Sequence, residues 1–289
     1  MALMLVAMLV LPGIDAIAKW LSDAISAGQV AWSRFFFQTL LMLPLFLRTR
    51  GTILTRALPL HALRGALIAL ATLLFFSALK YLPLADAISI FFVEPLILTL
   101  LSALFLGEAV GWRRLSAVAV GFVGALIVIR PGFGVLGLPA LLPLGTALSF
   151  AVYLILTRKL AQHEYPERMQ FYAGLFGALV MTLALAAGDA ADIAALSFVW
   201  PDLWQWCLLA GLGIIATAGH LLVVHAFRRA PAGLLAPFQY VEIVGATILG
   251  LVFFGDFPDA LTWLGVAIIV GSGLYVFHRE AALARRARS

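Results

Sequence analysis

The stretch that decides the fold is YLPLADAISIFFVEPLILTLLSALFLGE, residues 81–108. A helix needs roughly 20 residues to cross the hydrocarbon core of a bilayer, and this run is long enough to do so. The stretch returns as RAPAGLLAPFQYVEIVGATILGLVFFGD, residues 229–256, at an offset of 148 residues. In that register Pro83 meets Pro231 and Glu94 meets Glu242. A proline and an acid that recur together predict a chain built from two related halves.

The composition indicates that lipid surrounds most of the chain. Its 289 residues are 64% hydrophobic and only 11% charged, whereas roughly a quarter of the residues in ordinary globular domains are charged. The net charge of +5 comes from short basic clusters between apolar runs, which favours a membrane topology over nucleic-acid binding. The single cysteine, Cys207, excludes an internal disulfide and a thiolate metal cluster.

The apolar runs predict an all-α polytopic membrane protein, because open sheet edges cannot face lipid and the runs lack the alternation of a barrel strand. The ten expected spans are about 2–21, 28–47, 60–80, 83–106, 112–130, 139–157, 170–188, 203–227, 232–254 and 260–278. With the N-terminus in the cytoplasm, 15 of the 19 basic residues fall in internal segments and 3 in external ones. The excess of internal basic residues therefore predicts that both termini are cytoplasmic.

The repeat divides the chain into a first five-helix half, 1–130, and a second, 139–278, followed by a cytoplasmic basic tail, 279–289. Because five is odd, the second half enters the membrane from the opposite side. Inverted repeats of this kind are typical of secondary transporters, which alternate access around a central site. One chain holds both halves, so a monomer would suffice, while a dimer stays open.

A known family shares these features. Glu94-Pro95 followed by Leu-Gly-Glu at 106–108, in two copies, with Arg34 early in the second span, resembles the EamA-type family of the drug/metabolite transporter superfamily. The resemblance covers nearly the whole chain. It implies a protein of the bacterial inner (plasma) membrane that exports small metabolites, and the chain looks most like the aromatic amino acid exporters. The second copy departs from the pattern, because Ile243 stands where the first copy has its proline.

Ionisable groups inside a membrane cost about 3 kcal/mol each, so each one is a functional hypothesis. Glu94 and Glu242 fall near the midplane of their spans, where inverted-repeat transporters bind substrate. Each carboxylate could hold an amino group or take up a proton, or it could merely hydrogen-bond a neighbouring helix. The candidate substrate-binding residues are Glu94, Gln239, Tyr240, Glu242, Phe91, Tyr153 and His220.

A second charged group lies nearer the outer face. Asp15 and Lys19 are one helical turn apart and can pair along the first helix, and Arg34 falls at a similar depth. These three residues are expected to form either an ion pair that holds helices together or a gate that opens as access switches. Arg34 could alternatively meet a carboxylate of the substrate.

Two further patterns concern the backbone. Prolines interrupt helical hydrogen bonding and allow a helix to bend, and four of them fall in the fourth and ninth spans: Pro83, Pro95, Pro231 and Pro237. Small residues four apart let helices approach closely. Such pairs predict that the fifth and tenth helices pack on each other through Ala117, Gly121, Ala267 and Gly271.

Several functions are excluded or made less favourable. The sequence has no phosphate-binding loop of the Gly-x-x-x-x-Gly-Lys-Ser/Thr type and no metalloprotease signature, so we expect no cofactor and no metal, and transport that draws on protons or on the substrate's own gradient. Transport of a larger metabolite, such as a nucleotide sugar or S-adenosylmethionine, stays open. An intramembrane enzyme, with His220 beside Ser149 or Thr217, is a distant alternative; the chain is expected not to be an enzyme.

Overall fold

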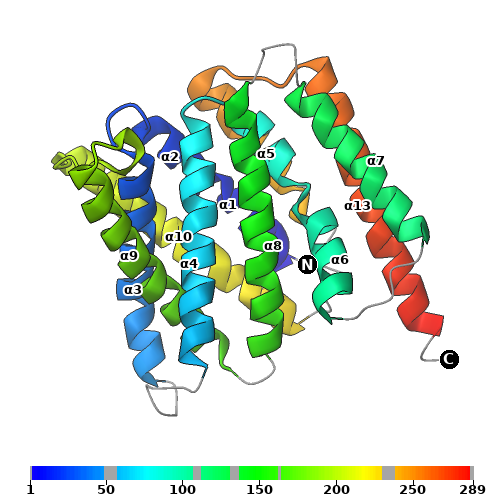
Figure 1. Ribbon diagram of the computed structural model, residues 1–289, viewed down its shortest axis with the longest axis horizontal. Coiled ribbons are helices and arrows are strands. Elements are labelled where there is room, and N and C mark those ends of the chain that lie inside the picture. The colour runs from blue at the N-terminus through cyan, green and yellow to red at the C-terminus, as the bar shows by residue number, and fades with distance from the viewer. Residues whose placement is uncertain are drawn as a thin grey trace.

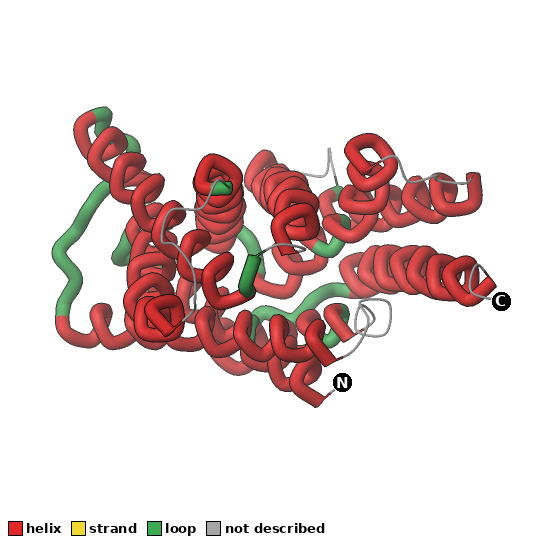
Figure 2. The backbone as a smooth tube through the Cα atoms, turned by 90° about the horizontal axis from the view of Figure 1, so that it is seen from below, coloured by secondary structure: helices red, strands yellow, loops and turns green. Residues whose placement is uncertain are grey.

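The computed structural model describes residues 2–48, 57–106, 112–130, 137–161, 164–229 and 238–286. Within these residues all regular structure is helical and no strand occurs (Figures 1 and 2). Seven helical spans are long and apolar enough to cross a membrane, and three shorter apolar helices cover 115–129, 242–254 and 260–276. Together they account for the ten predicted spans, so the chain is an all-α polytopic membrane protein.

The helices of the first half are α1 (Ala2–Val10), α2 (Pro12–Leu21), α3 (Ala27–Arg48), α4 (Leu58–Leu79), α5 (Leu84–Phe91), α6 (Glu94–Leu106) and α7 (Trp112–Ile129). Those of the second half are η1 (Leu138–Ala140), α8 (Leu141–Ala161), α9 (Pro166–Ala190), η2 (Ala194–Leu196), α10 (Leu203–Arg229), α12 (Glu242–Leu249), η3 (Gly250–Phe254) and α13 (Ala260–Arg286). The first span is thus broken into α1 and α2, and the fourth into α5 and α6.

The two halves interleave and do not stand apart as separate bodies. The most extensive helix contacts each join one half to the other: α7 packs on α13, α3 on α9, and α4 on both α8 and α9. Figure 1 shows α3, α4, α8 and α9 standing side by side, with α7 and α13 paired at one edge. The main apolar core draws its buried side chains from helices of both halves. Relative motion of the halves must therefore occur across packed helix pairs.

The α7–α13 pair forms as expected, but through different small residues in α13. A side chain at Gly124 would meet the carbonyl oxygen of Gly265 at 2.9 Å, so these two backbones touch. Ala117 is buried in α7, and Gly121 lies against Ser272. The expected partners were wrong: Ala267 is exposed, and nothing lies within 4 Å of a side chain built at Gly271. Gly271 instead lines a shallow hollow of about 400 Å³ on the outside of the pair.

The last helix is longer than its predicted span. α13 continues to Arg286, so most of the expected basic tail is its last two turns. The reason is composition, because residues 279–286 are alanine, leucine, arginine and glutamate, which are strong helix formers.

Candidate substrate site

Both midplane glutamates begin a half-helix. The α5 helix ends at Phe91, and α6 begins at Glu94 after a turn. In the second half, a turn at 240–241 precedes α12, which begins at Glu242. The start of a helix leaves backbone N–H groups without intrahelical partners and carries the positive end of the helix dipole. At these two breaks the preceding turn supplies acceptors, because the N–H of Leu96 bonds to the carbonyl oxygen of Val93 and that of Gly245 to the carbonyl oxygen of Val241. Each break therefore adds a carboxylate and the positive end of a helix dipole to an apolar bundle.

The prolines explain the first break only in part. Pro95 lies in the first turn of α6 and cannot donate a hydrogen bond back into α5. Pro83 caps α5, with φ −55° and ψ 144°, and so sets where that helix begins. Pro231 and Pro237 lie outside the described residues.

Glu94 lies within electrostatic range of one aromatic residue of the second half, Tyr240. Its side chain is buried, and so is that of Tyr240, on which the charge of Glu94 acts. The Tyr240 ring meets Phe92 edge-on, with centroids 5.3 Å apart. The hydroxyl of Tyr240 occupies the space where a side chain at Gly273 of α13 would lie, so only glycine fits there. The two helix breaks thus meet through this aromatic pair.

A line of aromatic rings continues from the first break to α8. Phe91 contacts Phe75 of α4 with centroids 5.9 Å apart and Phe150 of α8 at 5.7 Å. Phe150 in turn stacks on Tyr153, at 5.5 Å. Rings from three helices therefore form one continuous wall that includes two of the predicted site residues, Phe91 and Tyr153.

The second cluster gathers around Arg34, which is buried with 9% of its surface exposed. Its guanidinium donates a hydrogen bond to the hydroxyl of Thr72 in α4. Asp15 of α2 and His220 of α10 both lie within electrostatic range of Arg34. Glu242 lies in range of Asp15. Asp15, Arg34, His220 and Glu242, from four helices, thus act on one another electrostatically, but no hydrogen bond or ion pair within 4.0 Å joins any two of them among the described residues.

Two predicted residues take a smaller part. The Nδ1 atom of His220 lies 2.8 Å from the carbonyl oxygen of Ala216, one turn earlier in α10, so the ring is tied to its own helix. Gln239 is half-buried beside Tyr240, and no hydrogen bond joins it to another described residue. Both residues remain candidates for substrate binding because of where they lie, and not because of any contact that they make.

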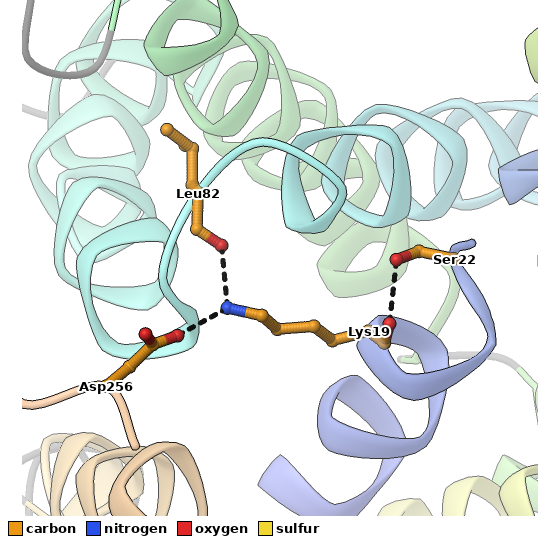
Figure 3. A network of polar contacts seen from close by, with 4 residues as sticks. All are labelled: Lys19, Ser22, Leu82 and Asp256. Atoms are coloured by element: carbon orange, nitrogen blue, oxygen red, sulfur yellow. Dashed lines mark hydrogen bonds and ion pairs between the residues drawn. The ribbon is translucent and has the colours of Figure 1, made fainter. Parts of the chain in front are cut away.

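Lys19 does not pair with Asp15, as the spacing suggested. Its Nζ atom lies 2.7 Å from Oδ2 of Asp256 and donates a second hydrogen bond to the carbonyl oxygen of Leu82, at 3.1 Å (Figure 3). It also lies 4.9 Å from the centre of the Phe254 ring. Asp256 belongs to the second half, so this contact, hereafter the outer latch (Lys19, Leu82 and Asp256), joins the two repeats. Asp15 instead lies within electrostatic range of Arg34 and Glu242.

A second contact joins the repeats at the same end. Arg130, after α7, donates hydrogen bonds to the carboxylate of Asp259 and to the Thr262 hydroxyl. The bond from Arg130, together with one from the backbone N–H of Thr262, holds the pKa of Asp259 well below its usual range. The same bond raises the pKa of Arg130. Both groups stay charged at neutral pH.

A buried network at the opposite end of the molecule was not predicted. Arg64 of α4 is 1% exposed; it donates hydrogen bonds to the hydroxyls of Thr157, at 3.0 Å, and Tyr153, at 3.2 Å, both in α8. Nearby, His61 Nε2 lies 3.8 Å from Glu164 Oε1. Arg64 was counted among the cytoplasmic basic residues, although its position inside the third predicted span was a signal that it is buried. Through Tyr153 this network touches the aromatic wall.

No group of three or more His, Cys, Asp or Glu side chains among the described residues could hold a metal ion. The arrangement instead offers carboxylates, the buried guanidinium groups of Arg34 and Arg64, and aromatic faces. Such groups bind the charged and planar parts of a small organic molecule.

Comparison with known proteins places this architecture in a family. A sequence model of the EamA-like transporter family matches residues 1–130 and again residues 137–277. A solved crystal structure superposes on 99% of this chain and 98% of its own with a TM-score of 0.65, at 22% sequence identity, which supports the fold.

Three similar proteins have names that state a cargo. An S-adenosylmethionine uptake transporter of Rickettsia bellii is 30% identical and aligns over 92% of this chain and 89% of its own. A riboflavin transporter of Vibrio cholerae is 29% identical, over 99% and 95%. A pseudopaline exporter of Pseudomonas aeruginosa is 31% identical, over 89% and 88%. All three are transporters of small metabolites, and none of their names supports the expected amino acid cargo.

Proposed function

Because the chain belongs to the EamA-like transporter family, we propose that it carries a small metabolite with a planar ring and a positively charged group across the membrane by alternating access. The observation that supports this proposal is the meeting of two helix breaks, at Glu94 and Glu242, beside a wall of aromatic rings. Carboxylates and aromatic faces both attract cations. Planar rings stack on aromatic side chains.

The paired α7 and α13, one from each repeat (1–130 and 139–278), form a static edge, while the fourth and ninth predicted spans, which are broken at Glu94 and Glu242, bend as access switches. The chain lies in a bacterial inner membrane with both termini in the cytoplasm, and one chain is sufficient for transport. An amino acid would be exported, whereas S-adenosylmethionine would be imported or exchanged. Glu94 or Glu242 takes up the proton if transport is coupled to protons. These statements rest on the inverted repeat and on the distribution of basic residues.

Two cargo classes fit the site. Aromatic amino acids were expected from the family resemblance, and each has one ring and one ammonium group. S-adenosylmethionine has a larger flat base and a sulfonium cation besides its ammonium group, and the name of the Rickettsia bellii relative favours it. We therefore place S-adenosylmethionine first and tryptophan second.

The test is uptake by proteoliposomes that contain the purified protein. Labelled S-adenosylmethionine, tryptophan and riboflavin are compared, with and without a pH gradient. Glu94→Gln and Glu242→Gln are compared with the parent and with Asp23→Asn, which removes an exposed carboxylate at one end of the molecule. A charged hydrogen bond contributes about 1.5–3 kcal/mol, so we expect a 10- to 100-fold slower uptake in at least one glutamine variant.

Other outcomes of the uptake assay would each refute a different part of the proposal. Saturable uptake of riboflavin alone would refute the requirement for a cation. Equal transport by the parent and both glutamine variants would show that the carboxylates only pack. If no compound moves through protein that is folded, the proposed cargo class is wrong.

A further inference from the structure

The outward face of the α7–α13 pair holds a shallow hollow that the proposed transport does not use. Its volume is about 400 Å³, and the pair stands at one edge of the bundle (Figure 1). The lining residues come from these two helices: Trp112, Arg113, Ser116, Ala117, Val120, Gly271, Ser272 and Tyr275. Because the chain spans a membrane, this outer face of the bundle lies against lipid.

The lining changes from polar to apolar along the pair. Arg113 lies in the first turn of α7, and Val120 lies seven residues deeper, about 10 Å along the helix. Ala117, Val120 and Gly271 make the deeper part apolar, and nothing lies within 4 Å of a side chain built at Gly271. A phospholipid has its parts in the same order, because its phosphate lies at the membrane surface and its acyl chains lie in the core. The hollow therefore matches an occupant with a polar head and an apolar body.

The positive charge of the hollow comes from Arg113. Its guanidinium lies 5.3 Å from the centre of the Trp112 ring, and no acidic side chain among the described residues pairs with it within 4.0 Å. The first turn of α7 adds the positive end of its helix dipole. In the sequence, residues 108–116 and 272–286 hold five arginines and two glutamates. This end of the pair is therefore positive, which favours an anionic occupant.

We propose that the hollow binds one anionic phospholipid, with its phosphate on Arg113 and an acyl chain along Val120 and Gly271. Arginine binds phosphate oxygens through short, often two-bonded contacts, and basic pockets between transmembrane helices bind anionic head groups. Trp112 and Tyr275 supply aromatic rings, which favour the head-group region of a bilayer. The lipid contacts one helix of each repeat, so its binding stabilises the α7–α13 pair. This site is separate from the cargo site and does not depend on the proposed cargo.

The experiment measures lipid binding to the purified, delipidated protein in detergent by native mass spectrometry. Dioleoyl phosphatidylglycerol, which is anionic, is compared with dioleoyl phosphatidylcholine, which has no net charge. The parent is expected to bind phosphatidylglycerol with a Kd roughly 5-fold lower, the factor that one arginine near an anionic head group contributes. In Arg113→Gln this preference falls to about one. Arg48→Gln removes the same charge from the exposed end of α3 and keeps the preference of the parent.

A second variant tests the shape of the hollow and not its charge. Gly271→Leu fills the apolar part, where the structure leaves open space, and should weaken the binding of phosphatidylglycerol. Phosphatidylglycerol should raise the thermal unfolding midpoint of the parent and raise it much less in Arg113→Gln and Gly271→Leu. Without added lipid the three proteins should unfold at similar midpoints. Free glycerol 3-phosphate carries the anion without acyl chains, so it should not shift the midpoint of the parent.

Three results would overturn the lipid site. The first is equal preference for phosphatidylglycerol in the parent and in Arg113→Gln. The second is an equal thermal shift of the parent with glycerol 3-phosphate, which would indicate a site for a soluble anion. The third is a dimer that excludes phosphatidylglycerol and is lost in Gly271→Leu, which would show that a second copy of the chain covers the hollow. None of these results bears on cargo uptake, so the proposed function would stand or fall separately.

Discussion

The outer latch makes a prediction that the structure allows us to quantify. In Asp256→Asn the side chain keeps its shape and loses its charge, so Lys19 loses its ion pair and keeps only neutral partners: the amide oxygen of the new side chain, the carbonyl oxygen of Leu82 and the Phe254 ring. Because Asp256 and Lys19 belong to different repeats, the change weakens a contact that closes this end of the molecule. We expect the substitution to favour states in which the repeats separate there.

The size of the effect follows from burial. The Lys19 side chain is 15% exposed and that of Asp256 33%, so the pair lies between two measured limits. Fully exposed ion pairs contribute about 0.2–1 kcal/mol, and hydrogen bonds to charged groups inside proteins about 1.5–3 kcal/mol. A contribution of about 1–2 kcal/mol corresponds to a 5- to 30-fold change in an equilibrium constant.

The assay measures how often this end opens. A cysteine is introduced at Ala87, buried in α5, in a Cys207→Ser background, and its reaction with a water-soluble thiol reagent is followed. Because labelling requires opening, Asp256→Asn should speed it by the same 5- to 30-fold, and Asp23→Asn should not change it. The double variant with Lys19→Met should be no faster than Asp256→Asn alone. Strictly additive effects of the two substitutions, or an unchanged labelling rate in Asp256→Asn, would refute the latch.

Three other predictions concern stability, measured by thermal unfolding in detergent. Asp259→Asn should lower stability by less than about 1 kcal/mol at neutral pH, because its ion pair is exposed. Since the pKa of Asp259 is lowered in the folded protein, this contribution is present above the ordinary value of 3.8 and should vanish as the pH falls below it. A stability difference between parent and variant that grows on acidification would contradict the assignment. Gly124→Leu should destabilise the protein by about 1–3 kcal/mol by overpacking α7 against α13, whereas Gly271→Ala should be neutral or slightly stabilising because the site is open; equal losses would show that the helix contact is misassigned. Arg64→Met should cost roughly 3 kcal/mol, since it leaves buried partners unmatched, while the same change at exposed Arg113 should have little effect, and similar midpoints for the two variants would argue against the buried network.

The number and position of the spans could be predicted because the bilayer imposes a length on each apolar run. The repeat also placed Glu94 and Glu242 at matching points, and both proved to begin half-helices. The partner of Lys19 could not be predicted in this way. Spacing along one helix suggested Asp15, four residues away, whereas Asp256 comes close only after the two halves have packed.

The rotation of a helix about its own axis could not be predicted from the sequence either. A helix in lipid is apolar on every side, so no polar stripe tells which face meets a neighbour. Ala267 and Gly271 share one face of α13, but the helix turns Gly265 and Ser272 toward α7 instead. Arg64 was misjudged for a related reason, because an arginine near a helix end can extend to water or fold into the bundle.

The outer latch has a counterpart in the sequence at the other end of the molecule. The repeat that aligns the halves pairs Lys19 with Lys159, which is exposed, and Asp256 with Glu108, which lies outside the described residues. If the halves exchange conformations during transport, we expect Lys159 to gain an acidic partner when Lys19 leaves Asp256. The free energy lost when the contact on one side opens would then be nearly offset by the free energy gained when the contact on the other side forms. The two orientations would then have nearly equal free energies, and a shallow concentration gradient of the cargo would be enough to set the direction of transport.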